Sequence, residues 1–155
     1  MFKLGRLTDY AVVVLIDIYT HSEKSHNATR ISARTGIALP TVQKILKILS
    51  AGDILTSQRG VQGGYQLSQS PNDISIASIL TVMEGPIALT ACVEGGDGDC
   101  RVENICTVKG RWDKVNEAVE KSLNNVKLSH MVEQGYKSSP FMPLSDEKYR
   151  QRDYR

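Results

Sequence analysis

The sequence predicts a mainly α-helical fold in which one β hairpin interrupts the helices and a long helix follows. Three observations predict it. Amphipathic helical segments fill the first 50 residues, a glycine-rich hairpin comes directly after them, and apolar residues recur at helical spacing between residues 105 and 126. Apolar residues at every third or fourth position indicate a helix, whereas alternation indicates a half-buried strand.

The first two helices are expected over residues 8–21 and 28–35. The first has apolar side chains over most of its surface, which favours burial on more than one side. Thr8 and Asp9 are suitable residues to begin it. Asn27 is suitable to cap the second helix, because its side-chain oxygen can accept a hydrogen bond from a free backbone N–H.

The third helix is expected over residues 40–50, with Pro40 in its first turn. Its inward apolar residues are Val42, Ile45, Leu46 and Leu49. Its outward residues are Thr41, Gln43, Lys44 and Lys47. Strands are expected over residues 54–58 and 65–68, joined by a turn at 59–64 whose glycines permit positive φ.

Two further helices are expected, over residues 75–83 and 105–126. The apolar residues of the second are Ile105, Val108, Trp112, Val115, Val119 and Val126. Their spacing of three and four residues is typical of a helix that packs along another helix. We therefore expect a dimer interface, made by the first five of these residues. The stretch from 133 to 155 has two prolines, few aliphatic residues and mixed charge, which predicts a disordered tail.

Length and charge limit the possible classes of protein. A chain of 155 residues forms one domain or one domain with an appendage, and its net charge is only +2. The charges are unevenly placed: residues 1–60 carry eight bases and four acids, whereas residues 84–106 carry five acids and one base. Without a run long enough to span a membrane or a signal-peptide layout, we expect a cytoplasmic protein.

The second and third helices fit a helix-turn-helix that binds DNA. Ser32, Gly36, Val42 and Ile45 follow one another at spacings of four, six and three residues, as its tight turn and packing require. The second helix of such a unit lies in the major groove. The candidate DNA contacts are Thr41, Gln43, Lys44, Lys47 and, at the tip of the hairpin or wing, Arg59. Glutamine can bind adenine edges, lysine binds phosphates, and arginine can enter a narrow minor groove.

The cysteines of the chain are Cys92, Cys100 and Cys106, in a loop rich in glycine and aspartate. Three thiols cannot all pair within one chain, and thiolates select iron–sulfur clusters, zinc or copper. Structural zinc prefers closer cysteine pairs, so the gaps of seven and five residues favour a larger group such as a cluster. A fourth ligand is then needed, and carboxylates, Asp9 among them, are its best source.

Other interpretations stay open at this point. The thiols could form a metal-free redox switch, could bind zinc in a winged-helix regulator, or could be unliganded. An enzyme or electron carrier is disfavoured, because the sequence has no nucleophile–base pair, nucleotide-binding loop or catalytic histidine cluster.

The chain resembles the Rrf2 family of winged-helix transcriptional regulators over about residues 1–132. The resemblance rests on residues 7–12, 40–46 and 59–67 and on the three-cysteine loop, and residues 84–90 are similar to the branch that controls SUF cluster-assembly genes. It implies a homodimer in which the long helices cross, and a two-iron or four-iron cluster on the three cysteines. It further implies a repressor, with operator DNA as its ligand and iron–sulfur assembly genes as its targets.

The resemblance also bears on the fourth ligand. One branch of the family uses a histidine three residues after the last cysteine, where this chain has Lys109. A nitric-oxide-sensing branch uses an aspartate near the N-terminus of the other subunit, and Asp9 matches it. The expected organisation is a DNA-binding domain (1–84), a cluster-binding loop (85–104), a dimerisation helix region (105–132) and the tail (133–155).

Overall fold

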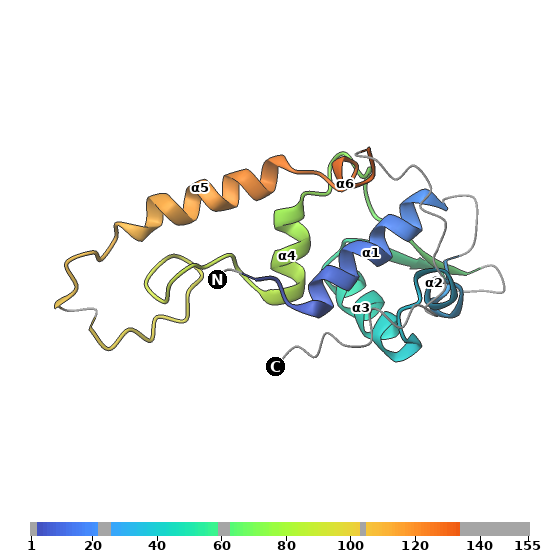
Figure 1. The fold of residues 1–155 in the computed structure, drawn as a ribbon, viewed down its shortest axis with the longest axis horizontal. Helices are drawn as coiled ribbons and strands as arrows, with labels where there is room; N and C mark the ends of the chain where they lie inside the picture. Colours follow the sequence, from blue (N-terminus) through green and yellow to red (C-terminus); the bar gives the residue numbers. More distant parts are fainter. Residues whose placement is uncertain (1–2, 22–25, 59–62, 103–104, 134–155) are drawn as a thin grey trace, which may run out of the picture.

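Helices and one hairpin make up the fold in the computed structural model (Figure 1). The structure describes residues 3–21, 26–58, 63–102 and 105–133. Its helices are α1 (Arg6–Thr20), α2 (Ala28–Thr35), α3 (Leu39–Ala51), α4 (Ile76–Glu84), α5 (Trp112–Asn125) and the short α6 (His130–Glu133). Its strands are β1 (Leu55–Gln58) and β2 (Gly64–Leu67). The mainly α-helical fold with a two-stranded wing is thus confirmed.

Local signals in the sequence set the ends of α2, α3 and α4. The Asn27 side chain accepts a hydrogen bond from the backbone N–H of Arg30, which caps α2 as predicted. Gly36 ends α2 in the left-handed conformation, with φ of 73°. Ser75 caps α4 by accepting from the N–H of Ser78. In contrast, α1 begins two residues before Thr8, at a point where Gly5 provides no side-chain cap.

The wing is an antiparallel pair in which Leu55 lies opposite Leu67 and Gln58 opposite Gly64. It follows α3 directly, because Gly52 ends that helix and leads into β1. The predicted turn at 59–64, including Arg59, lies mostly outside the described residues.

One apolar core joins α1, α3 and α4. Its fully buried residues include Val14 and Leu15 of α1, Ile45, Leu46 and Leu49 of α3, and Ile79 of α4. Leu128, which follows α5, is also fully buried in this cluster. Its backbone N–H donates to the carbonyl of Ile74, so the chain returns to the core after α5.

The long helix is shorter than predicted. It begins at Trp112, so the prediction that Ile105 and Val108 belong to it is wrong. Gly110 interrupts the helical path with φ of 70°, and a left-handed residue cannot continue a right-handed helix. Residues 105–111 form turns instead, although their apolar side chains keep the helical spacing seen in the sequence.

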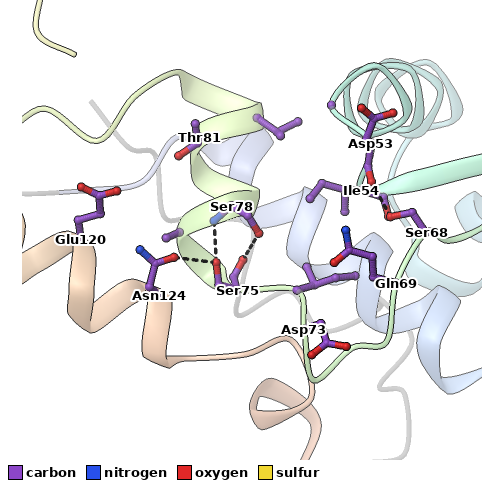
Figure 2. Close-up of a pocket in the computed structure, with 14 residues that line it drawn as sticks. Asp53, Ile54, Ser68, Gln69, Asp73, Ser75, Ser78, Thr81, Glu120 and Asn124 are labelled. Carbon is purple, nitrogen blue, oxygen red and sulfur yellow. Dashed lines mark hydrogen bonds between the residues drawn. The ribbon is translucent and has the colours of Figure 1, made fainter. Parts of the chain in front are cut away.

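The inward face of α5 packs against α4. Asn116 is buried, and Val119 and Leu123 are half-buried, at spacings of three and four residues that place them on one side of the helix. The Ser75 hydroxyl donates to the Asn124 side chain at 3.1 Å, joining the start of α4 to the end of α5 (Figure 2). The opposite end of α5 extends away from α1–α4, toward the cysteine segment (Figure 1).

Candidate nucleic-acid interface and cysteine segment

Helix α3 presents the predicted DNA contacts on its free side. Gln43, Lys44 and Lys47 are exposed and Thr41 is half-buried, while the inward residues are buried in the core. The position of Arg59 lies outside the described residues. The unit therefore has a polar, basic helix face next to a β wing, the arrangement in which a helix enters the major groove.

A buried polar network joins α1, α2 and the wing. Arg34 donates to both carboxylate oxygens of Asp17, with Nε lying 2.8 Å from Oδ1. The same guanidinium lies 3.3 Å from Nδ1 of His26, which is only 5% exposed. The backbone carbonyl of His26 accepts from the N–H of Tyr65 in β2. The base of the wing is thus held to the helix-turn-helix through residues for which the sequence pattern carries no signal.

The charges in this network shift two pKa values. Burial lowers the pKa of His26 from its usual 6.5, and the neighbouring Arg34 lowers it further; Asp17 opposes this shift, and His21 adds slightly to it. The hydrogen bonds to Asp17 raise the pKa of Arg34. Asp17 therefore has a permanently charged partner, while His26 is held neutral.

The cysteine segment begins as a compact set of turns. Backbone bonds run from the N–H of Gly96 to the carbonyl of Val93 and from the N–H of Gly98 to that of Ala91. A Cβ at position 96 would lie 2.6 Å from the Ala91 carbonyl oxygen, so this crossing requires glycine. Val93, the first residue of one of these turns, is buried. Cys92 and Cys100 lie at the two ends of this compact part.

The three thiols are free and half-buried, which leaves each accessible to a ligand. Their chemistry fits an iron–sulfur cluster or another thiolate-bound metal. Within the described part of a single chain, however, no group of three or more Cys, His, Asp or Glu residues is close enough to hold a metal ion. Asp9 is exposed in the first turn of α1. The donors thus suit the predicted group in type, while the single chain leaves them apart.

Asn116 holds the start of this segment against α5. Its side-chain nitrogen donates to the Ile87 carbonyl at 2.8 Å, and its oxygen accepts from the Leu89 N–H at 2.9 Å. Both hydrogen-bonding groups of a buried amide are therefore used by the backbone leading to Cys92. The sequence gives no signal for this role, since an asparagine inside a helix resembles a solvent-facing residue.

Cavities border α5 in the described part of the chain. One of about 390 Å³ lies between α4, α5 and the start of the wing, and the carboxylates of Asp53, Asp73 and Glu120 line it (Figure 2). Another of about 680 Å³ lies between α5 and residues 86–95. Both cavities are lined in part by acidic side chains, whereas the exposed face of α3 is basic.

The helix-turn-helix, the adjoining wing and the basic face of α3 together define a winged-helix transcriptional regulator. The chain belongs to the Rrf2 family: the sequence model of that family, described as an iron-dependent transcriptional regulator, matches residues 4–134. This confirms the resemblance read from the sequence.

Relatives with similar sequences are transcriptional regulators too. The chain is 30% identical to the HTH-type transcriptional regulator IscR of Vibrio vulnificus over 131 residues, or 84% of this chain and 77% of the relative. It is 29% identical to IscR of Yersinia pseudotuberculosis over 124 residues, or 79% of this chain and 74% of that protein.

Solved structures share the fold. IscR of T. potens is 26% identical and superposes with a TM-score of 0.62, covering 84% of this chain and 86% of that one. CymR of B. subtilis, described as a global cysteine regulator, is 23% identical and superposes with a TM-score of 0.64, covering 84% of this chain and 96% of that one.

Among the described residues, no helix is both long and apolar enough to cross a bilayer.

Proposed function

We propose that this chain is a homodimeric, DNA-binding repressor that responds to an iron–sulfur cluster held by Cys92, Cys100 and Cys106, with Asp9 of a second copy as the fourth ligand. Its targets would be genes of iron–sulfur assembly. The observation that carries the proposal is that three free, accessible thiols lie on the segment that joins the winged helix to α5. Such a cluster would supply a soft centre that oxidants and nitric oxide can attack.

An exposed apolar surface supports the dimer. Trp112 and Val115 of α5 are 40% and 44% exposed, and Ile105 is 81% exposed. Large apolar side chains gathered on one segment are typical of a surface that a partner covers. Val119 of α5 is half-buried in the single chain and would lie at the edge of this surface.

Packing links the proposed fourth ligand to the recognition helix. Asp9 lies in the first turn of α1, and the next turns of α1 bury Ala11, Val14 and Leu15 in the core shared with α3. A pull on Asp9 would therefore displace α1 and α3 together. Since half-sites about one DNA turn apart need a fixed spacing of the two recognition helices, cluster state would alter operator binding.

The proposal is tested on protein purified without oxygen. We expect a brown protein with iron and acid-labile sulfide, whose DNA binding changes when the cluster is removed and returns on reconstitution. Cys92→Ser should abolish cluster uptake, and Asp9→Ala should give a short-lived cluster. Asp113→Ala is the matched control, because it too removes an acid from a first helical turn. Iron-free protein whose DNA binding responds only to thiol oxidants would instead establish the redox switch, and zinc uptake the zinc site.

The dimer has its own test. Val115→Glu puts a charge into the exposed apolar surface and should give monomers in sedimentation equilibrium, because burying an unpaired charge is costly. Lys114→Glu adds the same side chain at the neighbouring exposed position and should leave the dimer intact. Equal association of both variants would exclude this surface as the interface.

A further inference from the structure

Glu84, the last residue of α4, contacts the beginning of α1. One carboxylate oxygen, Oε1, accepts a hydrogen bond from the Gly5 N–H at 2.9 Å and another from the Thr8 hydroxyl. Thr8 is 1% exposed, so its hydroxyl is shielded from water and bonds to Glu84 instead. We call this set of three residues the Glu84 contact.

The Glu84 contact supplies a side-chain acceptor at the start of α1 and a favourable place for a carboxylate at the end of α4. Helix α1 has no side-chain cap of its own at Gly5, and Glu84 supplies an acceptor there. A carboxylate at the C-terminal end of α4 is disfavoured by the helix dipole, whereas the same carboxylate beside the N-terminal end of α1 is favoured. The position of Glu84 is thus explained by α1 and not by its own helix.

Glycine at position 5 leaves room for this close approach. A Cβ at position 5 would lie 2.9 Å from Oε1 of Glu84. The chain therefore combines a glycine, a buried hydroxyl and a carboxylate from residues nearly 80 positions apart in the sequence.

The contact lies between the two ligand-bearing parts of the chain. Asp9 follows Thr8 directly, and its backbone N–H donates to the Gly5 carbonyl. After Glu84, Gly85 and Pro86 begin the segment that reaches Cys92, and the Asn116 side chain holds Ile87 and Leu89 of that segment. The backbone on both sides of the Glu84 contact is fixed by hydrogen bonds.

We propose that Glu84 is a positioning residue, which holds the Asp9 end of α1 and the base of the cysteine segment in one arrangement. The inference rests on the proposed function, in which Asp9 and the cysteines of one chain serve the two different clusters of a dimer. Glu84 then joins the two cluster sites within each chain. Without it, Asp9 is presented loosely to the second copy and the cluster is lost sooner.

The test compares cluster lifetimes. Protein is reconstituted without oxygen from ferrous iron and sulfide, and loss of visible absorbance is followed after a chelator is added. Glu84→Ala should lose the cluster about tenfold faster than the wild type, the scale of one charge-assisted hydrogen bond. Glu84→Gln keeps an oxygen acceptor but loses the charge, so its rate should lie between those of the wild type and Glu84→Ala. Glu117→Ala, which removes an exposed carboxylate from α5, should keep the wild-type rate.

A double variant separates positioning from general stability. If Glu84 acts through Asp9, adding Glu84→Ala to Asp9→Ala should change the rate of cluster loss by no more than about twofold. A full tenfold effect in the Asp9→Ala background would mean that Glu84 only stabilises the fold, and would overturn the inference. An unchanged lifetime in Glu84→Ala would overturn it as well.

The protein without a cluster gives an independent readout. Hydrogen exchange at the Gly5 amide should speed up about tenfold in Glu84→Ala and less in Glu84→Gln, because the bond to Oε1 protects this amide. Thr8→Val, which removes the hydroxyl with little change of shape, should shorten the cluster lifetime as Glu84→Ala does. Equal exchange in all variants contradicts the contact itself. Wild-type protein that takes up no cluster overturns the proposed function, and this is seen before any Glu84 variant is measured.

Discussion

At the scale of single residues, the surroundings of His26 disfavour its protonated form. A guanidinium can only donate hydrogen bonds, so Nδ1 of His26 must accept from Arg34 and cannot carry a proton. The buried imidazole is therefore neutral, in agreement with its lowered pKa. Protonation would break this bond and place a second positive charge beside Arg34.

The stability of the fold should consequently depend on pH. The folded-state pKa of His26 lies below the unfolded value of 6.5, so the unfolded chain binds this proton more readily. The free energy of unfolding should thus be highest above pH 6.5, and should fall as the pH drops from 6.5 through the folded-state pKa. Urea denaturation at about pH 8 and about pH 5.5 measures the change.

A non-titrating variant provides the control for His26. His26→Gln retains an acceptor for Arg34 and should show a smaller loss of stability between the two pH values. The other titratable neighbours in this network are Asp17 and His21, which stay the same in both proteins. Equal pH dependence in the variant and the wild type would assign the effect to another group.

At the scale of the elements, one side chain of α5, that of Asn116, holds the segment before Cys92. Asn116→Ala would leave the Ile87 carbonyl and the Leu89 N–H without their partner. We expect a loss of about 2 kcal/mol in the free energy of unfolding, the usual cost of unsatisfied, partly buried backbone groups. Hydrogen exchange at the Leu89 amide should also become faster, and the free energy of opening derived from it should fall by a similar amount.

The neighbouring position serves as the control for Asn116. Glu117→Ala removes an exposed side chain from the same turn and should change stability by less than about 0.5 kcal/mol. If Leu89 exchanges at the wild-type rate in Asn116→Ala, the segment before Cys92 is held by other contacts.

The helices could be predicted wherever the signal is local. The Asn27 cap and the buried stripe of α3 depend on residues a few positions apart, and the structure confirms them. The start of α5 could not be predicted, because apolar residues keep their spacing through 105–111 and only the backbone of Gly110 breaks the helix. The Asn116 and Glu84 contacts join residues far apart in the chain, for which periodicity carries no information.

On the scale of the whole molecule, the basic face of α3 should set the salt dependence of DNA binding. Lys47→Ala removes one exposed charge from that face. If Lys47 neutralises a phosphate, the slope of log affinity against log salt should fall by about 1 for each recognition helix engaged. Fluorescence anisotropy with a random-sequence duplex over a range of salt concentrations measures this slope.

A lysine elsewhere on the molecule gives the comparison for Lys47. Lys121→Ala removes a charge that is also exposed, from α5, far along the chain from α3, and should leave the slope unchanged. Equal slopes for Lys47→Ala and the wild type would place the DNA on a different surface.

Only part of the candidate site could be predicted from the sequence. The three cysteines and the polar face of α3 could be selected from residue types and spacing alone. The described part of one chain does not bring the ligands together, because its donors lie apart and Asp9 is proposed to bind the cluster of a second copy. The assignment of Asp9 therefore comes from the resemblance to the family and not from the geometry of the monomer.

The burial of Leu128 limits how this protein can be cut or recombined. Leu128 fills the same interior as α1 and α3, although it follows α5 in the chain. A fragment that stops after the wing, or after α4, would expose a cavity where this leucine was. A chimaera that joins this winged helix to another sensor should therefore include residues 126–132, because without them the winged helix would be less stable.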